Sequence, residues 1–238
     1  MNPDTGTATD NALWAKDGLF APLRSACADD WERYVNHDFV RRLGAGTLPE
    51  AAFRHYLAQD YLFLIHFARA YGLAVFKSAT LAEMRYAAGG LKAILDLEMG
   101  LHVKYCAGWG MSEANMAALP EANATIAYTR YVLERGLAGD LLDLEVALAP
   151  CVLGYAEIAE RLVRDPKTKY AGNPYRDWIE MYAGPEYRAV ARAAAEALDD
   201  LWLTRAGRAR FDALAETFRQ ASRLEADFWQ MGLDAVHS

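Results

Sequence analysis

Apolar residues recur at spacings of three and four along most of the chain, and this periodicity limits the possible folds more than any other feature. It places apolar side chains on one face of an α-helix, whereas a half-buried β-strand needs strict alternation, which no segment displays. The dominant residues, Ala, Leu, Glu and Arg, are strong helix formers. We therefore expect an all-α protein with helices at residues 13–34, 48–78, 81–108, 112–137, 140–164, 174–182, 185–204 and 207–234.

The boundaries between these segments indicate a single helical domain. Capping-box patterns, in which a hydroxyl and a carboxylate satisfy free backbone amides, occur at Thr47 with Glu50 and at Thr80 with Glu83. Glycine and proline clusters mark short turns, and none is long enough to be a linker. We expect a multi-helix bundle over residues 12–238, preceded by a mobile tail at residues 1–11.

Composition and charge exclude several classes of protein. With 53% hydrophobic residues among 238, the chain can form a sizeable core, and its net charge of -7 opposes binding to nucleic acid. No apolar run is long enough to span a bilayer. The three cysteines, Cys27, Cys106 and Cys151, form no CxxC pair and are odd in number, which favours a reducing cytoplasm over secretion.

One carboxylate shares a predicted helix face with aromatic rings. Asp60, Phe63 and Phe67 are spaced i, i+3 and i+7, and Tyr56 lies one turn earlier. A carboxylate in such surroundings is costly unless it is paired or used. Asp60 therefore fits either a structural hydrogen bond to a neighbouring helix or a role in binding a ligand.

Two further segments combine reactive groups with rings. Cys151 follows Pro150 and lies one turn before Tyr155, and Glu225 lies one turn before Trp229. A lone cysteine is usually a small buried apolar residue, and a glutamate beside a tryptophan often faces solvent. The alternative is a nucleophilic thiol and a carboxyl whose raised pKa lets it donate a proton.

Short motifs that contain these residues follow one another in a fixed order along the chain. They are His37-Asp-Phe39, Gly46-Thr-Leu-Pro49, Gln59-Asp60-Tyr61, His66-Phe67, Glu98-Met-Gly-Leu-His102, Ala127-Tyr128-Thr129, Ala149-Pro150-Cys151 with Tyr155 and Glu157, Tyr175 through Tyr182-Ala-Gly184, and Glu225 with Phe228-Trp229. In this order and spacing the chain resembles the TenA family of thiaminase II or aminopyrimidine aminohydrolases, over about residues 19–234. Because it has Cys151, the chain resembles the cysteine-bearing branch of that family.

The resemblance implies a haem-oxygenase-like helical bundle, a homotetramer and a deep pocket for a 4-amino-2-methylpyrimidine. It implies a cytoplasmic enzyme of thiamin salvage that hydrolyses 4-amino-5-aminomethyl-2-methylpyrimidine to the hydroxymethyl compound. We expect this enzyme to need no cofactor and to bind neither nucleic acid nor membranes. Thiamin itself is a second candidate substrate.

The resemblance also implies roles for individual residues. Cys151 would be the catalytic thiol, Glu225 the acid and base, and Asp60 the group that binds the amino edge of the substrate ring. The substrate-binding side chains would be Phe63, Tyr128, Tyr155 and Tyr182. Some relatives have a tyrosine where this chain has Phe63, so one hydroxyl is absent here. One nucleophile, one proton shuttle and one ring-binding acid suffice for this hydrolysis.

Two other functions remain open from the sequence. Glu98 and His102 are spaced i, i+4 and could join Glu157, Glu225 or Asp60 in a di-iron-type oxidase site, although the usual repeated Glu-x-x-His pattern is missing. We therefore expect no metal site and interpret Glu98 with His102 as a polar pair. The other possibility is a non-catalytic pyrimidine-binding protein, which would not need Cys151 and Glu225 together.

Overall fold

The computed structural model describes residues 13–15, 17–205 and 207–236. Every regular element in these ranges is a helix, which confirms the all-α prediction. The tail predicted at residues 1–11 lies outside the described residues. None of the described helices combines the length and apolar character needed to cross a membrane.

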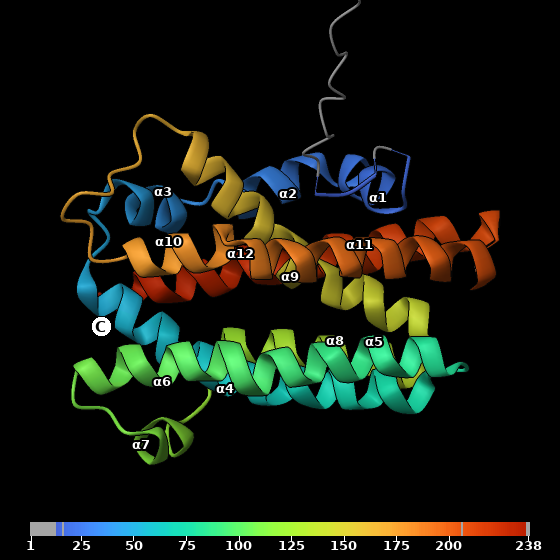
Figure 1. Ribbon diagram of the computed structural model, residues 1–238, viewed down its shortest axis with the longest axis horizontal. Coiled ribbons are helices and arrows are strands. Elements are labelled where there is room, and N and C mark those ends of the chain that lie inside the picture. The colour runs from blue at the N-terminus through green and yellow to red at the C-terminus, as the bar shows by residue number, and fades with distance from the viewer. Residues whose placement is uncertain (1–12, 16, 206, 237–238) are drawn as a thin grey trace, which may run out of the picture.

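The helices follow one another with short connections, as expected for a bundle (Figure 1). In chain order they are α1 (Phe20–Ala26), α2 (Ala28–Val35), α3 (Asp38–Ala45), α4 (Glu50–Lys77), α5 (Leu81–Ala93), the π-helix η1 (Ile94–Glu98), α6 (Met99–Gly108), α7 (Glu113–Ala117), α8 (Asn123–Ala138), α9 (Leu141–Arg164), α10 (Arg176–Ala183), α11 (Pro185–Arg205), the 3-10 helix η2 (Arg208–Arg210) and α12 (Phe211–Asp234).

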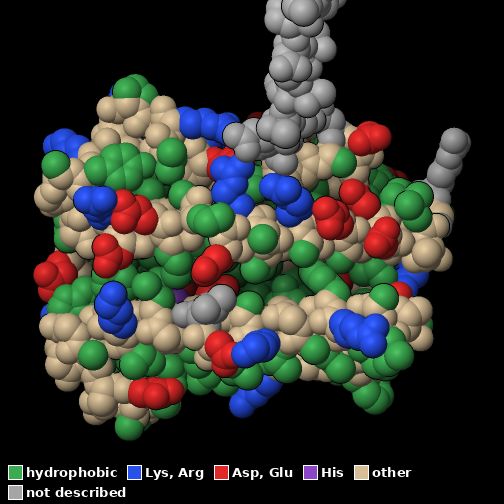
Figure 2. Space-filling view, viewed as in Figure 1, with side chains coloured by type: hydrophobic (Ala, Val, Ile, Leu, Met, Phe, Trp, Pro, Cys, Tyr) green, Lys and Arg blue, Asp and Glu red, His purple; other side chains and the backbone are tan. Residues whose placement is uncertain are grey.

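Three long helices, α4, α9 and α12, contact one another at the centre of the molecule. In Figure 1, α4, α5, α6 and α8 lie together on one side, α10, α11 and α12 lie on the other, and α1, α2 and α3 pack onto α12. Figure 2 shows that the surface is hollowed between the two sides.

Two central helices are buried all round over part of their length. Residues 56–64 of α4 and residues 144–159 of α9 are all buried, so these stretches have no solvent-facing side. Polar residues in them, such as Asp60 and Glu157, must therefore find partners inside the protein.

Two predicted helices are divided by non-helical residues, and a third, 81–108, is interrupted by the π-helix η1. The segment 13–34 is divided at Cys27, whose backbone leaves the helical region (φ -133°, ψ 38°). The segment 112–137 is divided before Pro120, because the residue before a proline disfavours helical geometry. The short helix α3 was not predicted, since the glycines that end it were interpreted only as a turn.

The two predicted caps have different outcomes. The Thr80 hydroxyl accepts a hydrogen bond from the backbone N–H of Glu83 at 3.2 Å, so this cap is confirmed. The cap predicted at Thr47 with Glu50 is wrong, because Pro49 takes the N-cap position of α4 and no side chain caps this end.

The contact between α2 and α9 is unusually close at Gly154. A Cβ atom there would collide with the ring of Tyr34. The Tyr34 hydroxyl also donates a hydrogen bond, at 3.2 Å, to the backbone carbonyl of Pro150, which lies one turn before Gly154 in α9. Since proline has no N–H, it gives no helical hydrogen bond to the turn before it, yet α9 continues through Pro150 without a break. The small residue at position 154 thus sets how Tyr34 meets α9.

We expect Gly154→Ala to destabilise the protein by about 1 to 3 kcal/mol, because the added methyl group overpacks this contact. Urea denaturation measures the change. Gly72→Ala is the matched control: Gly72 lies exposed within α4 with open space around its Cβ position, so the same substitution should stabilise the helix by up to about 1 kcal/mol. Equal stability of Gly154→Ala and the wild type would contradict the tight packing.

Candidate active site

The seven side chains predicted for the site come from five helices and lie together in the protein interior. All are buried, with Cys151 the most exposed at 8%. They are Asp60 and Phe63 from α4, Tyr128 from α8, Cys151 and Tyr155 from α9, Tyr182 from α10 and Glu225 from α12. Residues up to 165 positions apart in the chain, from Asp60 to Glu225, thus meet in one region.

The carboxyl of Glu225 contacts more polar groups than any other member of this set. Its Oε1 accepts a hydrogen bond from the Tyr128 hydroxyl at 2.8 Å, and the Cys151 thiol and Tyr34 hydroxyl lie beside it. Burial raises the pKa of Glu225 to about 8; these three polar neighbours oppose the rise and the negative charge of Asp60 adds to it. A carboxyl with such a pKa can both give and take a proton near neutral pH.

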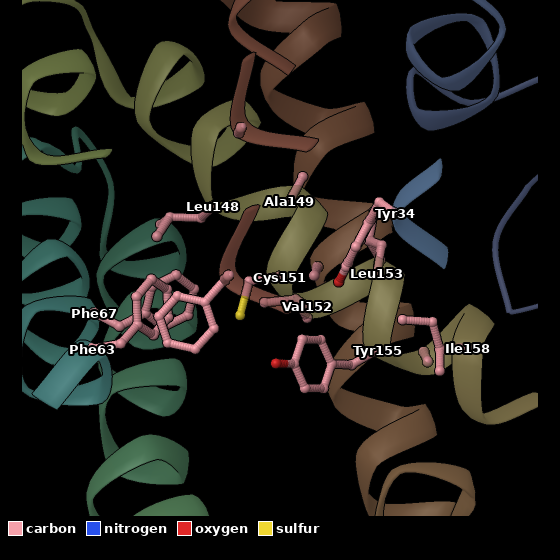
Figure 3. Packing of buried hydrophobic residues seen from close by; sticks show 14 of the residues in the cluster. Tyr34, Phe63, Phe67, Leu148, Ala149, Cys151, Val152, Leu153, Tyr155 and Ile158 are labelled. Carbon is pink, nitrogen blue, oxygen red and sulfur yellow. The ribbon is translucent and has the colours of Figure 1, made fainter. Parts of the chain in front are cut away.

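The thiol of Cys151 is protonated in the free protein. Burial raises the pKa of Cys151 well above its ordinary value, and the negative charges of Glu225, Glu98 and Asp60 raise it further. In Figure 3 the sulfur and the Tyr155 hydroxyl point toward the same space. Because the thiolate is the reactive form, a neighbouring base must take the thiol proton as the sulfur attacks, and Glu225 is within hydrogen-bonding reach.

Asp60 forms a buried ion pair with His102. The Nε2 atom of His102 lies 2.6 Å from Asp60 Oδ2, and its Nδ1 atom lies 2.7 Å from the backbone carbonyl oxygen of Glu98. A carboxylate and a carbonyl oxygen can only accept hydrogen bonds, so the His102 ring donates to both when each of its nitrogens carries a proton. Burial alone would lower the pKa of His102, but the hydrogen bond and charge of Asp60 outweigh it and raise that pKa. The cationic ring therefore balances the Asp60 carboxylate.

A chain of hydroxyl groups connects Asp60 with the aromatic side of the site. The Tyr56 hydroxyl hydrogen-bonds to Asp60, and it lies 3.2 Å from the Tyr155 hydroxyl. The Trp178 indole N–H donates to the same Tyr56 oxygen at 3.3 Å. These contacts fix the positions of Asp60 and Tyr155 relative to each other.

Aromatic rings surround the polar groups. The ring of Phe63 lies 4.9 Å from that of Tyr128, and the ring of Tyr155 lies 4.8 Å from that of Tyr182 and 5.3 Å from that of Trp229, measured between centroids. Such rings provide flat surfaces on which a heteroaromatic ligand can stack while water is excluded.

Four polar groups of the site escaped the sequence analysis. His102 was interpreted as a partner of Glu98, whereas its ring pairs with Asp60 and contacts only the backbone of Glu98. Tyr34, Tyr56 and Trp178 were not assigned to the site. The sequence offered one signal for these partners: a buried carboxylate such as Asp60 is costly unless a hydrogen-bond donor lies nearby.

The acids considered for a di-iron site do not adopt the arrangement that such a site needs. Among the described residues, no group of three His, Cys, Asp or Glu side chains has an arrangement that could hold a metal ion. Glu157 lies apart from the others and binds Arg24, Trp31 and Arg161.

The fold and these contacts define a helical protein whose interior holds a cysteine and a glutamate in contact within an aromatic enclosure. The chain belongs to the TENA/THI-4/PQQC family, whose model matches residues 24–235.

Individual relatives agree with this assignment. A protein of Halalkalibacterium halodurans named aminopyrimidine aminohydrolase is 36% identical, with coverage of 84% of this chain and 89% of its own. A Helicobacter pylori protein of the same name is 31% identical, with coverage of 84% and 92%. The crystal structure of a protein described as a TenA family transcription regulator, from a Silicibacter species, is 46% identical and superimposes with a TM-score of 0.85, covering 90% of this chain and 96% of the other.

A further buried carboxyl, Glu145 of α9, lies outside the cluster around Cys151. Its Oε2 accepts a hydrogen bond from the Tyr86 hydroxyl at 3.4 Å, and its Oε1 has no hydrogen-bond partner among the described residues. Tyr71 hydrogen-bonds to Tyr86 beside it. Burial raises the pKa of Glu145 to about 8, so the folded protein holds this carboxyl protonated at neutral pH.

We expect Glu145→Gln to stabilise the protein more at pH 8 than at pH 5. The pKa of this carboxyl rises from its ordinary value of 4.5 to about 8 on folding. Its contribution to stability is therefore complete below pH 4.5 and is lost as the pH rises toward 8, because Glu145 ionises freely in the unfolded chain but not in the folded protein. Glutamine does not ionise, so the Glu145→Gln variant does not lose stability in this way. The advantage of the variant should grow by up to roughly 3 kcal/mol between the two pH values.

Urea denaturation at both pH values measures this difference. Glu180→Gln serves as the control, because Glu180 lies exposed on α10 in an ion pair with Arg176. Parallel pH profiles for wild type and Glu145→Gln would show that Glu145 does not titrate in this way.

Proposed function

We propose that this chain is an aminopyrimidine aminohydrolase that converts 4-amino-5-aminomethyl-2-methylpyrimidine to the hydroxymethyl compound in thiamin salvage. The observation that carries the proposal is that the Cys151 thiol lies beside the Glu225 carboxyl, inside an aromatic enclosure that also contains Asp60. The relatives named aminopyrimidine aminohydrolase support the same substrate class. Its cysteines are free, in keeping with a cytoplasmic enzyme.

In the proposed reaction the sulfur of Cys151 adds to the ring carbon next to the one that bears the aminomethyl group. The thiol proton passes to Glu225, and Glu225 protonates the adjacent ring nitrogen. The electron pair loaded into the ring then expels ammonia from the methylene carbon and leaves an exocyclic methide. Water adds to that carbon, the carbon–sulfur bond breaks and the aromatic ring is restored, so that water replaces ammonia overall.

Asp60 and the aromatic side chains would position the ring for this attack. As a carboxylate, Asp60 accepts a hydrogen bond from the ring amino group, and His102 holds the carboxylate in place from the other side. Phe63, Tyr128, Tyr155 and Tyr182 would provide the walls of the substrate pocket.

We expect Cys151→Ala and Glu225→Gln each to lower the rate of ammonia release by at least about 1,000-fold, because each removes a group that takes part in covalent or proton-transfer chemistry. The assay measures ammonia and identifies the product by mass, with the aminomethylpyrimidine and with thiamin as separate substrates. The ratio of the two wild-type rates identifies the preferred leaving group.

Cys106→Ala is the matched control, because Cys106 is also a fully buried thiol but lies in α6, away from Glu225. It should retain wild-type activity. Near-normal turnover by either Cys151→Ala or Glu225→Gln, with the fold intact by circular dichroism, would remove that residue from the mechanism.

We also propose that the protein is a homotetramer. Large apolar side chains are exposed where the ends of α4, α8 and α11 and the start of α5 meet, at one end of the bundle (Figure 1). Phe76 is 83% exposed and Leu203 is 82% exposed, and an ion pair between Glu83 and Arg205 joins two of these helix ends. Contiguous exposed apolar surface of this kind typically marks an interface.

Light scattering should give the mass of four 26.4-kDa chains for the wild type. Phe76→Arg combined with Leu203→Arg should lower the mass, because buried charges at an interface are costly. Val163→Arg, another exposed apolar position but in α9, is the control and should leave the mass unchanged. A tetramer that survives the double substitution would exclude this end of the bundle as the interface.

A further inference from the structure

Glu98 lies at the end of the π-helix that interrupts the long segment from α5 to α6. A π-helical turn is wider than an α-turn and is frequently found at functional sites. The backbone carbonyl of Glu98 accepts a hydrogen bond from His102, the residue that pairs with Asp60. The backbone of Glu98 is therefore tied to the proposed ring-binding acid.

The side chain of Glu98 borders a pocket of about 370 Å³ that opens to the surface between η1, α6 and α11. This volume lies within the range of roughly 300 to 1,000 Å³ that is usual for small-molecule sites. The hollow between the two sides of the bundle in Figure 2 corresponds to this region. The other wall includes Tyr187, whose hydroxyl donates to the carbonyl of Val152, directly after Cys151. Tyr187 therefore connects the wall of the pocket to the residue that follows the thiol.

Three carboxyls lie within electrostatic reach of Cys151, and only Glu98 has an uncommitted side chain. Asp60 is paired with His102, and Glu225 is hydrogen-bonded to Tyr128. The Glu98 carboxyl forms no hydrogen bond or ion pair with the described residues. Burial raises the pKa of Glu98 to about 7, the charge of Asp60 raises it further, and His102 opposes the rise.

Among the described residues, no cationic side chain forms an ion pair with the Glu98 carboxyl. The proposed substrate can supply a cation: at neutral pH the amine on its methylene carbon is an ammonium group. Glu98 borders the pocket and lies within electrostatic reach of both Asp60 and Cys151, so it can meet this group on a ring held by Asp60 and attacked by Cys151. A carboxylate that meets an ammonium group in a partly buried site favours it strongly over a neutral group.

We propose that Glu98 is a specificity-determining residue that receives a positively charged substituent on the methylene carbon of the substrate, entering from the pocket between η1, α6 and α11. This inference rests on the proposed function. It adds a residue and a ligand chemistry to that function: a cationic leaving group is selected over a neutral one.

The test compares two ligands that differ only in this charge. Isothermal titration calorimetry measures the affinity of the cationic 5-aminomethyl and the neutral 5-hydroxymethyl pyrimidine for Cys151→Ala, in which turnover is blocked. Adding Glu98→Gln to this background should weaken binding of the cation by about 10- to 100-fold and change binding of the neutral ligand by less than about twofold.

Two further variants sharpen the comparison. Glu196→Gln removes the same charge at an exposed position of α11 and should leave both affinities unchanged. Glu98→Asp keeps the charge with a shorter reach and should lose part of the cation preference, which provides a second measurement if Glu98→Gln fails to fold.

Equal loss of both ligands in Glu98→Gln would indicate a structural role and overturn the inference, as would an unchanged preference for the cation. If Cys151→Ala binds neither ligand and the wild type releases no ammonia, the proposed function fails and this inference fails with it. That outcome can be distinguished from a failure of this inference alone, because it is observed in proteins that retain Glu98.

Discussion

The ion pair between His102 and Asp60 governs the charge balance on which the interior of this protein depends. Three acids lie within electrostatic reach of Cys151, and both N–H groups of His102 are used, one on Asp60 and one on the carbonyl of Glu98. Asp60 therefore has a fixed hydrogen-bond partner. Glu225 and Glu98 have no comparable partner, and burial raises their pKa values to about 8 and about 7. One site thus contains an acid paired with a histidine and two acids that can exchange protons near neutral pH, a division of roles typical of active sites.

The position of the thiol follows from how α2 and α9 pack. The absence of a side chain at Gly154 lets Tyr34 lie against α9, where its hydroxyl reaches the Pro150 carbonyl and its ring approaches Glu225. Cys151 is the next residue after Pro150. A contact between two helices thereby fixes both the thiol and a tyrosine beside its proposed base, and the surrounding rings keep water from competing for the same proton.

The sequence was sufficient for most of the helices and for a set of residues that the structure brings together, but not for the contacts among them. Periodicity located α4, α9 and α12 because their apolar faces repeat at helical spacing. The break at Cys27 was missed because no glycine or proline marks it. The resemblance to TenA proteins predicted roles for Cys151 and Glu225, whereas the approach of these two side chains and the pairing of Asp60 with His102 are contacts between different helices. Spacing within a helix cannot specify these, since they depend on how the helices pack.

The two remaining acids with raised pKa values show that such a shift does not identify a functional carboxyl by itself. Glu145 and Glu98 both owe their shifts mainly to burial. Glu145 faces Tyr86, which is a neutral donor, so the folded protein can hold it protonated as a structural group. Glu98 borders a pocket, and its backbone is tied through His102 to Asp60. A ligand that pairs with the Glu98 carboxyl would therefore bind to the residue whose backbone carbonyl supports His102 and, through it, the proposed ring-binding acid, so that recognition of the proposed leaving group and alignment of the ring would become parts of one event.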